Sequence, residues 1–210
     1  MLRSITIRLC VTFIREDKKM PFPRTWIEEL VVEWLQLEGF LAQSNIPVAV
    51  TPAGGRFEAD VIGARISQNT LQIRHIETGQ LASGRYSIKS VEKKFSESVV
   101  QSVTNHFRKR FSFSEGNVIY EKMYIATFST KSVVAALAEL GITVETVPQF
   151  IQERVLPTIQ AWKQNPPHQP QTKGQVITLP ESNWLLQMLD HLTVKGLLNI
   201  GRNENEMENS

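Results

Sequence analysis

The sequence has one cysteine and no long apolar run. Cys10 cannot form an internal disulfide or build a zinc site with a second cysteine, which fits a reducing compartment. Charges break every hydrophobic stretch before it reaches the roughly 20 apolar residues that a membrane-spanning helix needs. Arg8 interrupts the apolar residues near the start and no small-residue cleavage site follows, so a signal peptide is not indicated. We therefore expect a soluble, cytoplasmic protein without a membrane partner.

The sequence also has little excess charge and lacks several common catalytic motifs. Its 23 Lys and Arg against 21 Asp and Glu give a net charge of +2, so any nucleic-acid binding must depend on local basic patches. There is no glycine-rich phosphate-binding loop, no Ser-His-Asp nucleophile elbow and no Cys/His zinc framework. These absences argue against a P-loop NTPase, an α/β-hydrolase or a zinc-finger protein.

The chain is long enough for one main domain, with 210 residues of which 41% are hydrophobic. We expect residues 21–163 to form this domain, after an N-terminal extension of residues 1–20. Residues 164–180, rich in Pro and Gln, predict a linker. Residues 181–200 predict an amphipathic C-terminal helix, and the polar residues 201–210 predict a disordered tail.

Local patterns predict alternating helices and strands in the main domain. Apolar residues at intervals of three and four predict a first helix from Thr25 to Gly39 and one long helix over residues 90–111. The predicted strands are residues 46–51, 57–66, 71–77, 122–128 and 142–147, and the other predicted helices are residues 130–140 and 148–162. This order is that of an α/β protein with a mixed central sheet flanked by helices.

Two carboxylates are predicted to face each other across the first hairpin. If Gln68 and Asn69 form a two-residue turn, Asp60 lies directly opposite Glu77. Cross-strand partners have Cβ atoms roughly 4.5–5.5 Å apart, so both carboxylates can share one cation. Hard oxygen ligands favour Mg²⁺ or Mn²⁺, and such an ion can orient water and stabilise charge on a phosphodiester. A slip of one residue in the register would put the two carboxylates on opposite faces.

The residues around these carboxylates resemble the core of the PD-(D/E)XK, or restriction-endonuclease-like, nucleases. The similarity lies in a helix with an early glutamate, then Gly39-Phe40, then residues 55–63 and 71–79, and it extends over residues 26–162. It implies a restriction-endonuclease-like mixed sheet flanked by helices, to which the C-terminal helix is an addition. In that family the aspartate and the glutamate of a Glu-x-Lys segment bind metal, while the lysine positions the attacking water. The resemblance therefore implies DNA as the partner and Mg²⁺ or Mn²⁺ as the cofactor.

The second strand lacks the lysine that the resemblance requires. If Glu77 takes the place of the family's glutamate, the lysine position is Gly79. If His75 takes that place, Glu77 stands where the lysine belongs. Members of the family can supply the residue from a neighbouring helix. Lys93 or Lys94 in the following helix is the natural source, and Lys93 stands as the catalytic candidate.

Several further residues complete the predicted site. His75 shares a strand face with the glutamate two residues later, so it can ligate the metal or relay a proton. Glu28 lies at the edge of the first helix's apolar face, where the family's helical glutamate also approaches the metal. Arg108, Lys109 and Arg110 either contact DNA phosphates or complement the negative end of their own helix dipole.

These observations predict a metal-dependent nuclease that hydrolyses DNA phosphodiester bonds. Two alternatives stay open. The chain is a catalytically inactive nuclease-fold protein that binds nucleic acid or protein, or it is an interaction protein whose last helix docks onto a partner. A homodimer is compatible with the sequence, and the sequence does not decide between DNA and RNA.

Overall fold

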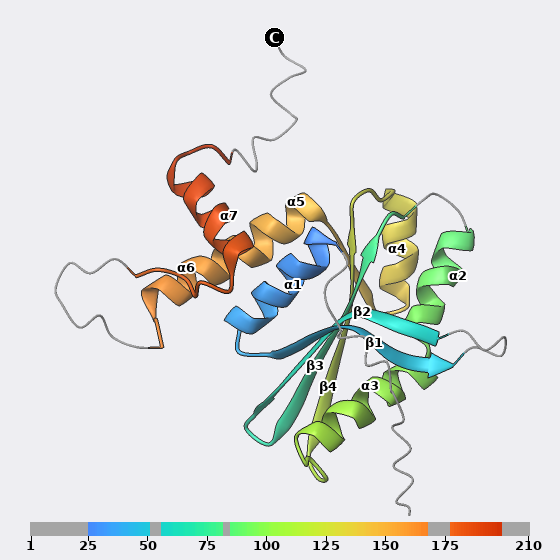
Figure 1. The fold of residues 1–210 in the computed structure, drawn as a ribbon. Helices are drawn as coiled ribbons and strands as arrows, with labels where there is room; N and C mark the ends of the chain where they lie inside the picture. Colours follow the sequence, from blue (N-terminus) through green and yellow to red (C-terminus); the bar gives the residue numbers. More distant parts are fainter. Residues whose placement is uncertain (1–24, 51–55, 82–84, 168–176, 199–210) are drawn as a thin grey trace, which may run out of the picture.

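A five-stranded mixed sheet with helices on both faces forms the body of the protein (Figure 1). The computed structural model describes residues 25–50, 56–81, 85–167 and 177–198. In spatial order the strands are β1 (Leu41–Val50), β2 (Arg56–Ser67), β3 (Thr70–Gly79), β4 (Asn117–Ala126) and β5 (Ile142–Thr146). The general α/β class predicted from the element order is confirmed. The predicted N-terminal extension and C-terminal tail lie outside the described residues.

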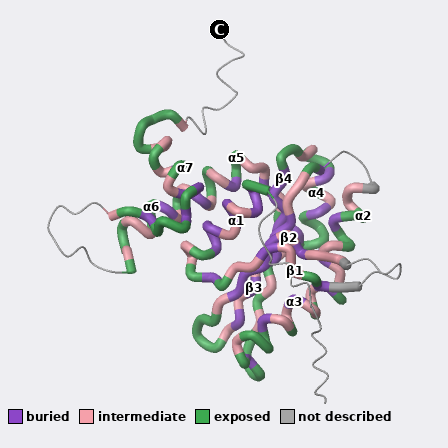
Figure 2. The backbone as a smooth tube through the Cα atoms, in the orientation of Figure 1, coloured by how far each residue is buried: buried purple, intermediate pink, exposed green. Residues whose placement is uncertain are grey.

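The helices divide between the two faces of the sheet. One face is covered by α2 (Arg85–Lys94), α3 (Glu97–Arg110) and α4 (Lys131–Glu139). The other is covered by α1 (Trp26–Leu37), α5 (Val147–Phe150), the π-helical segment Ile151–Val155, α6 (Leu156–Gln164) and α7 (Trp184–Val194). Figure 2 shows the buried residues concentrated along the sheet between these layers. Among the described residues, no helix has both the length and the apolar character to cross a membrane.

The β2–β3 hairpin has the predicted register. Val61 pairs with Ile76, and the ladder continues without a slip to a two-residue turn at Gln68 and Asn69. Both turn residues have positive φ values, 47° and 59°. A two-residue turn of this kind matches the right-handed twist of the flanking strands. The hairpin therefore brings the start of β2 and the end of β3 together, at the end opposite the turn.

β4 begins earlier than predicted, at Asn117 rather than at residue 122. Its first half alternates between exposed and half-buried residues, because β5 pairs with β4 only from Lys122 onward. Without a continuous apolar run, that half gives a weak strand signal in the sequence. β4 runs parallel to β3, and Tyr120 in its early part lies beside Ile73.

The prediction of one helix over residues 90–111 is wrong, because α2 ends at Lys94 and α3 begins at Glu97. The two helices cover different parts of one sheet face. Phe95 packs with β4 and α4, whereas Val99 packs with β1, β2 and β3. The apolar spacing of four continues across the junction, so periodicity does not reveal the break. The break leaves the end of α2 beside β3.

The C-terminal helix packs against the main fold through α1. Glu33 of α1 is buried and accepts hydrogen bonds from the backbone N–H groups of Leu185 (3.2 Å) and Leu186 (3.0 Å) at the start of α7. These contacts satisfy N–H groups that a helix start leaves without intrahelical partners. The inner face of α7 therefore packs against α1 of the same chain. The helix spans Trp184–Val194 and is shorter than the predicted helix over residues 181–200.

Candidate functional site

Asp60 and Glu77 converge where the β2–β3 ladder ends. The last pair of that ladder is Val61 with Ile76. Beyond it, the backbone N–H of Asp60 donates to Glu77 Oε1 at 3.3 Å, and the backbone N–H of Thr78 donates to Asp60 Oδ2 at 2.9 Å. Each carboxylate thus satisfies a backbone donor of the opposite strand. The ladder stops one pair short of Asp60 and Glu77, so the two residues meet through these side-chain contacts.

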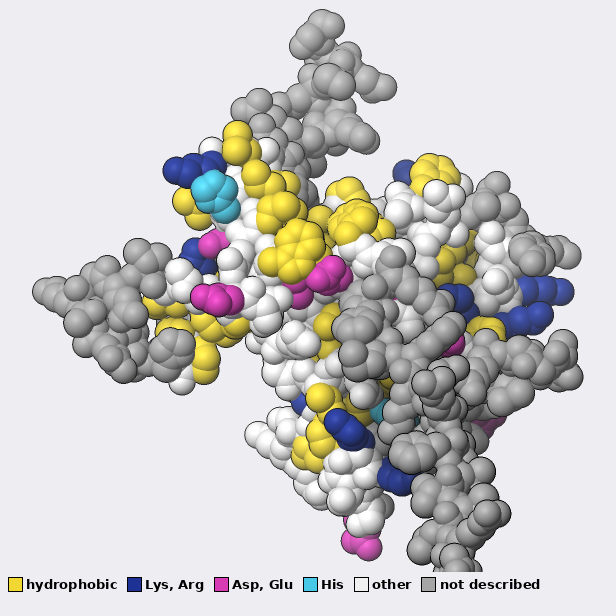
Figure 3. Space-filling view, in the orientation of Figure 1, with side chains coloured by type: hydrophobic (Ala, Val, Ile, Leu, Met, Phe, Trp, Pro, Cys, Tyr) yellow, Lys and Arg dark blue, Asp and Glu magenta, His cyan; other side chains and the backbone are white. Residues whose placement is uncertain are grey.

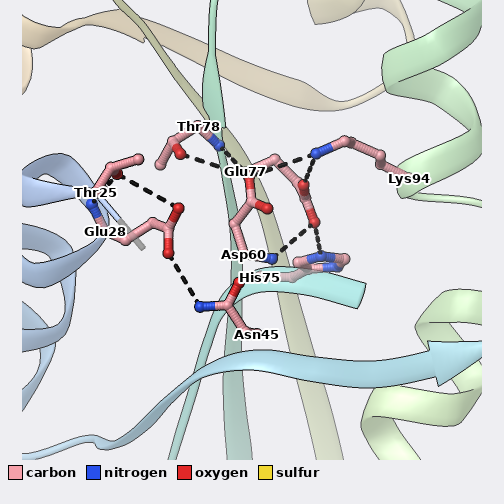
Figure 4. A network of polar contacts seen from close by, with 8 residues as sticks. All are labelled: Thr25, Glu28, Asn45, Asp60, His75, Glu77, Thr78 and Lys94. Atoms are coloured by element: carbon pink, nitrogen blue, oxygen red, sulfur yellow. Dashed lines mark hydrogen bonds and ion pairs between the residues drawn. The ribbon is translucent and has the colours of Figure 1, made fainter. Parts of the chain in front are cut away.

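A lysine from α2 joins this pair. Lys94 Nζ donates to Glu77 Oε2 and lies 3.4 Å from Asp60 Oδ2 (Figure 4). The candidate assigned from the sequence, Lys93, is exposed and lines a cleft that also contains residues of β4 and β5. Successive helical residues point about 100° apart, so only one of the two lysines can face the sheet. Lys94, rather than Lys93, therefore completes the charged cluster.

Burial and mutual contact set the charges in the cluster. The Glu77 side chain is fully buried, whereas the side chains of Asp60 and Lys94 are 21% and 26% exposed. Burial, together with the charge of Glu77, raises the pKa of Asp60 to about 6, although Lys94 and the Thr78 N–H act against this shift. For Glu77, burial favours the protonated form, but contacts with His75 and Lys94 outweigh it and lower the pKa.

Lys94 keeps its proton in this environment. Burial alone would lower the pKa of Lys94, but the charges of Glu77 and Asp60 outweigh burial and raise it. An ammonium group held between two carboxylates compensates the buried negative charge. The cluster therefore contains one cationic group shared by two acidic ones, drawn from β2, β3 and α2.

His75 supports Glu77 from inside the fold. It is fully buried, with Nε2 at 2.8 Å from Glu77 Oε1 and Nδ1 at 2.9 Å from the hydroxyl of Tyr120. Its ring also packs against Phe95, with 4.7 Å between ring centroids. Because protein groups engage both nitrogens, His75 acts on Glu77 and does not offer a nitrogen to a metal. Of its two predicted roles, metal ligation does not fit this geometry.

Glu28 lies on the side of Asp60 opposite Lys94 (Figure 4). It is buried in the first turn of α1, where Thr25 Oγ1 donates to its Oε1 at 3.4 Å and Asn45 Nδ2 donates to its Oε2 at 3.1 Å. No group of three or more His, Cys, Asp or Glu side chains in the described part of the chain is arranged to hold a metal ion. Glu28 therefore stays a predicted ligand, held by Thr25 and Asn45 in the first turn of α1.

Gly79 excludes a lysine at the position where the resemblance expects one. Its φ of +149° is unfavourable for residues with a side chain, and a Cβ atom there would lie 2.8 Å from the hydroxyl of Tyr124. Tyr124 is buried on β4 beside Glu77. The space next to Glu77 is thus filled by Tyr124, and the cation comes from α2 instead.

Sequence reasoning missed four polar residues around the predicted site. Thr78 binds Asp60, Asn45 binds Glu28 and Tyr120 binds His75, while Tyr124 fills the space beside Gly79. The two tyrosines reach the site through the parallel pairing of β3 and β4, which no local pattern reveals. A strand prediction beginning at residue 117 would have placed both tyrosines on the face of β4 that carries the site.

The predicted nucleic-acid contacts lie far from the carboxylates. Arg108, Lys109 and Arg110 are exposed at the end of α3, and the following segment brings Gly116 against Asn69 in the hairpin turn. The carboxylates are at the other end of β3, roughly 20 Å away at about 3.3 Å per strand residue. These cations are well placed to complement the negative end of the α3 dipole.

Comparison with other proteins identifies no relative. No protein-family model matches the chain, and neither the curated proteins nor the solved structures contain a significant match. Function is therefore inferred from the fold and from the geometry of the charged cluster.

Proposed function

We propose that the protein is a nuclease that hydrolyses DNA phosphodiester bonds with Mg²⁺ or Mn²⁺. The observation that carries this proposal is the cluster of Asp60, Glu77 and Lys94, which unites two carboxylates and one ammonium group from three separate elements. Asp60 and Lys94 are partly exposed, so a substrate can reach them. Perturbed pKa values in such a cluster are typical of catalytic sites.

The order of elements supports a restriction-endonuclease-like arrangement. A helix with a buried glutamate precedes an antiparallel three-strand meander that carries both carboxylates. The helices α2 and α3 lead to β4, and α4 connects β4 to its parallel neighbour β5. Apart from the division of the second helix into α2 and α3, this is the order that the sequence resemblance implies. Lys94 supplies, from α2, the positive charge that the family's strand lysine supplies from the position of Gly79.

The carboxylate pair fits a divalent cation. Asp60 and Glu77 already converge on one positive group, and Mg²⁺ is commonly bound by one or two carboxylates together with water and substrate phosphate. These two residues would hold the ion. When bound, it would polarise a phosphate oxygen and lower the pKa of a water molecule.

The chain's own groups have distinct tasks in this proposal. Lys94 stays protonated because its pKa is raised, so it stabilises negative charge on the phosphate rather than accepting a proton. Asp60 is the carboxylate closer to solvent and faces the substrate. His75 and the burial of Glu77 hold the second carboxylate in one orientation.

Cleavage of a supercoiled plasmid tests the proposal. Wild-type protein is expected to nick or linearise the plasmid in Mg²⁺ or Mn²⁺ but not with a chelator, and Asp60→Asn to lose at least about 100-fold in rate. Lys109→Gln, at the far end of the sheet, is the control and should cleave normally. DNA binding by wild type without any cleavage would instead support the catalytically inactive alternative.

A further inference from the structure

His75 is buried next to the rings of Phe95 and Tyr120, and both of its ring nitrogens face protein groups. Its ring packs against Phe95 at 4.7 Å and against Tyr120 at 6.2 Å between centroids, and the residue has no exposed surface. Buried polar groups without a hydrogen bond cost free energy, so both nitrogens must be satisfied locally. Nε2 faces Glu77 and Nδ1 faces the hydroxyl of Tyr120.

The partners of the ring assign its proton. An ionised carboxylate only accepts hydrogen bonds, so the ring nitrogen that faces Glu77 must carry a hydrogen. Glu77 forms an ion pair with Lys94 through Oε2 and accepts the backbone N–H of Asp60 at Oε1, so it is the acceptor in these contacts. Burial and the charge of Glu77 raise the pKa of Tyr120, so its hydroxyl keeps a hydrogen to donate. Nδ1 is then free to act as the acceptor.

We infer that Tyr120 is a positioning residue: its hydroxyl donates to Nδ1 of His75, which fixes the ring so that Nε2–H donates to Glu77. This chain of hydrogen bonds runs from β4 through β3 to the carboxylate that Lys94 contacts. Tyr120 reaches no reacting group itself and acts only through His75. Its catalytic consequence rests on the proposed nuclease function, whereas the hydrogen-bond chain is a property of the protein alone.

The loss of the Tyr120 hydroxyl should release the ring. In Tyr120→Phe the aromatic packing against His75 is kept, but Nδ1 loses its donor. The ring can then rotate or change its tautomer, and Glu77 loses a fixed donor at Oε1. Partners of this kind, which orient a catalytic or metal-binding group, typically contribute about 10- to 100-fold to activity.

Nitrogen-15 NMR of the histidine rings in the metal-free, DNA-free full-length protein tests the hydrogen-bond chain. The wild-type signals of His75, assigned by their absence in His75→Gln, should show a hydrogen on Nε2 and none on Nδ1. Tyr120→Phe should give mixed or broadened signals, whereas Tyr124→Phe, a control on the same strand, should leave them unchanged. A hydrogen on Nδ1 in wild type, or unchanged signals in Tyr120→Phe, would overturn the inference.

Cleavage kinetics test the consequence for the site. Tyr120→Phe should lower kcat by about tenfold with an unchanged KM for DNA, and should add nothing when His75→Gln is already present. Equal effects of Tyr120→Phe in both backgrounds would contradict action through His75. If wild type does not cleave but its NMR signals are as expected, the nuclease proposal fails while the assignment of the His75 proton stands.

Discussion

At the scale of single residues, Lys94 contacts both carboxylates of the site. Its ammonium group contacts Glu77, whose side chain has no exposure, and lies near Asp60. A carboxylate buried without a cation or a proton is costly, and removal of one partner of a buried ion pair typically costs 3–5 kcal/mol. The same lysine therefore contributes both to stability and to the proposed chemistry.

Lys94→Met should destabilise the protein by about 3 kcal/mol, because it leaves the Glu77 carboxylate with His75 as its remaining side-chain donor. Urea unfolding measures this change. Lys93→Met, one residue away and exposed, is the matched control and should shift the free energy of unfolding by less than about 0.5 kcal/mol. Equal effects of the two substitutions would contradict the assignment of Lys94 to the cluster.

Asp60 should give the protein a distinctive pH dependence. Its pKa is about 6 in the folded protein against 3.8 for an ordinary aspartate, so the folded state binds more protons between these values. Its contribution to stability therefore falls as the pH rises from 3.8 to about 6. Glu77, with a lowered pKa, acts in the opposite direction and loses its stabilising effect as the pH falls.

The comparison of wild type with Asp60→Asn separates these two effects. Across that pH window, the variant should gain up to about 3 kcal/mol in unfolding free energy relative to wild type, from the two-unit difference in pKa. Chemical denaturation at a series of pH values measures the gain. A constant difference between the two proteins would show that the pKa of Asp60 is not raised.

At the scale of helices and strands, local chemistry accounts for the elements that were predicted correctly. The hairpin follows from Asn69 in the turn and from alternation along its strands, and this register brings Asp60 beside Glu77. The break between α2 and α3 depends on which part of the sheet each helix covers, which is a tertiary effect. The choice between Lys93 and Lys94, and the part played by Tyr120, depended on such contacts and could not be predicted.

At the scale of the whole molecule, basic groups near the candidate site lie on α2 and β4 rather than at the end of α3. Lys89, Lys93 and Lys122 line a cleft of about 550 Å³ next to Phe95, which also contains the acidic Glu92 and Glu97. Figure 3 shows Lys and Arg side chains gathered over α2, at the right of the view. Under the proposed nuclease function, a DNA strand that reaches Lys94 would pass close to these lysines.

On the same proposal, Lys93→Gln should weaken DNA binding, because it removes a positive charge close to the bound strand. The slope of the logarithm of the binding constant against the logarithm of salt concentration should become shallower by about 1. Lys109→Gln, at the opposite end of the sheet, should leave the slope unchanged. Binding to a labelled duplex at several salt concentrations measures both. A shallower slope for Lys109→Gln alone would place the DNA at the end of α3.

The central claim is that Asp60 and Glu77 act together on a phosphodiester bond. The most direct measurement is the single-turnover rate of plasmid cleavage in Mg²⁺ by wild type, Asp60→Asn and Glu77→Gln, each checked for folding by thermal unfolding. We expect wild type to cleave and both folded variants to lose at least about 100-fold in rate. Cleavage by the variants at the wild-type rate, or folded wild type that does not cleave at all, would contradict the claim.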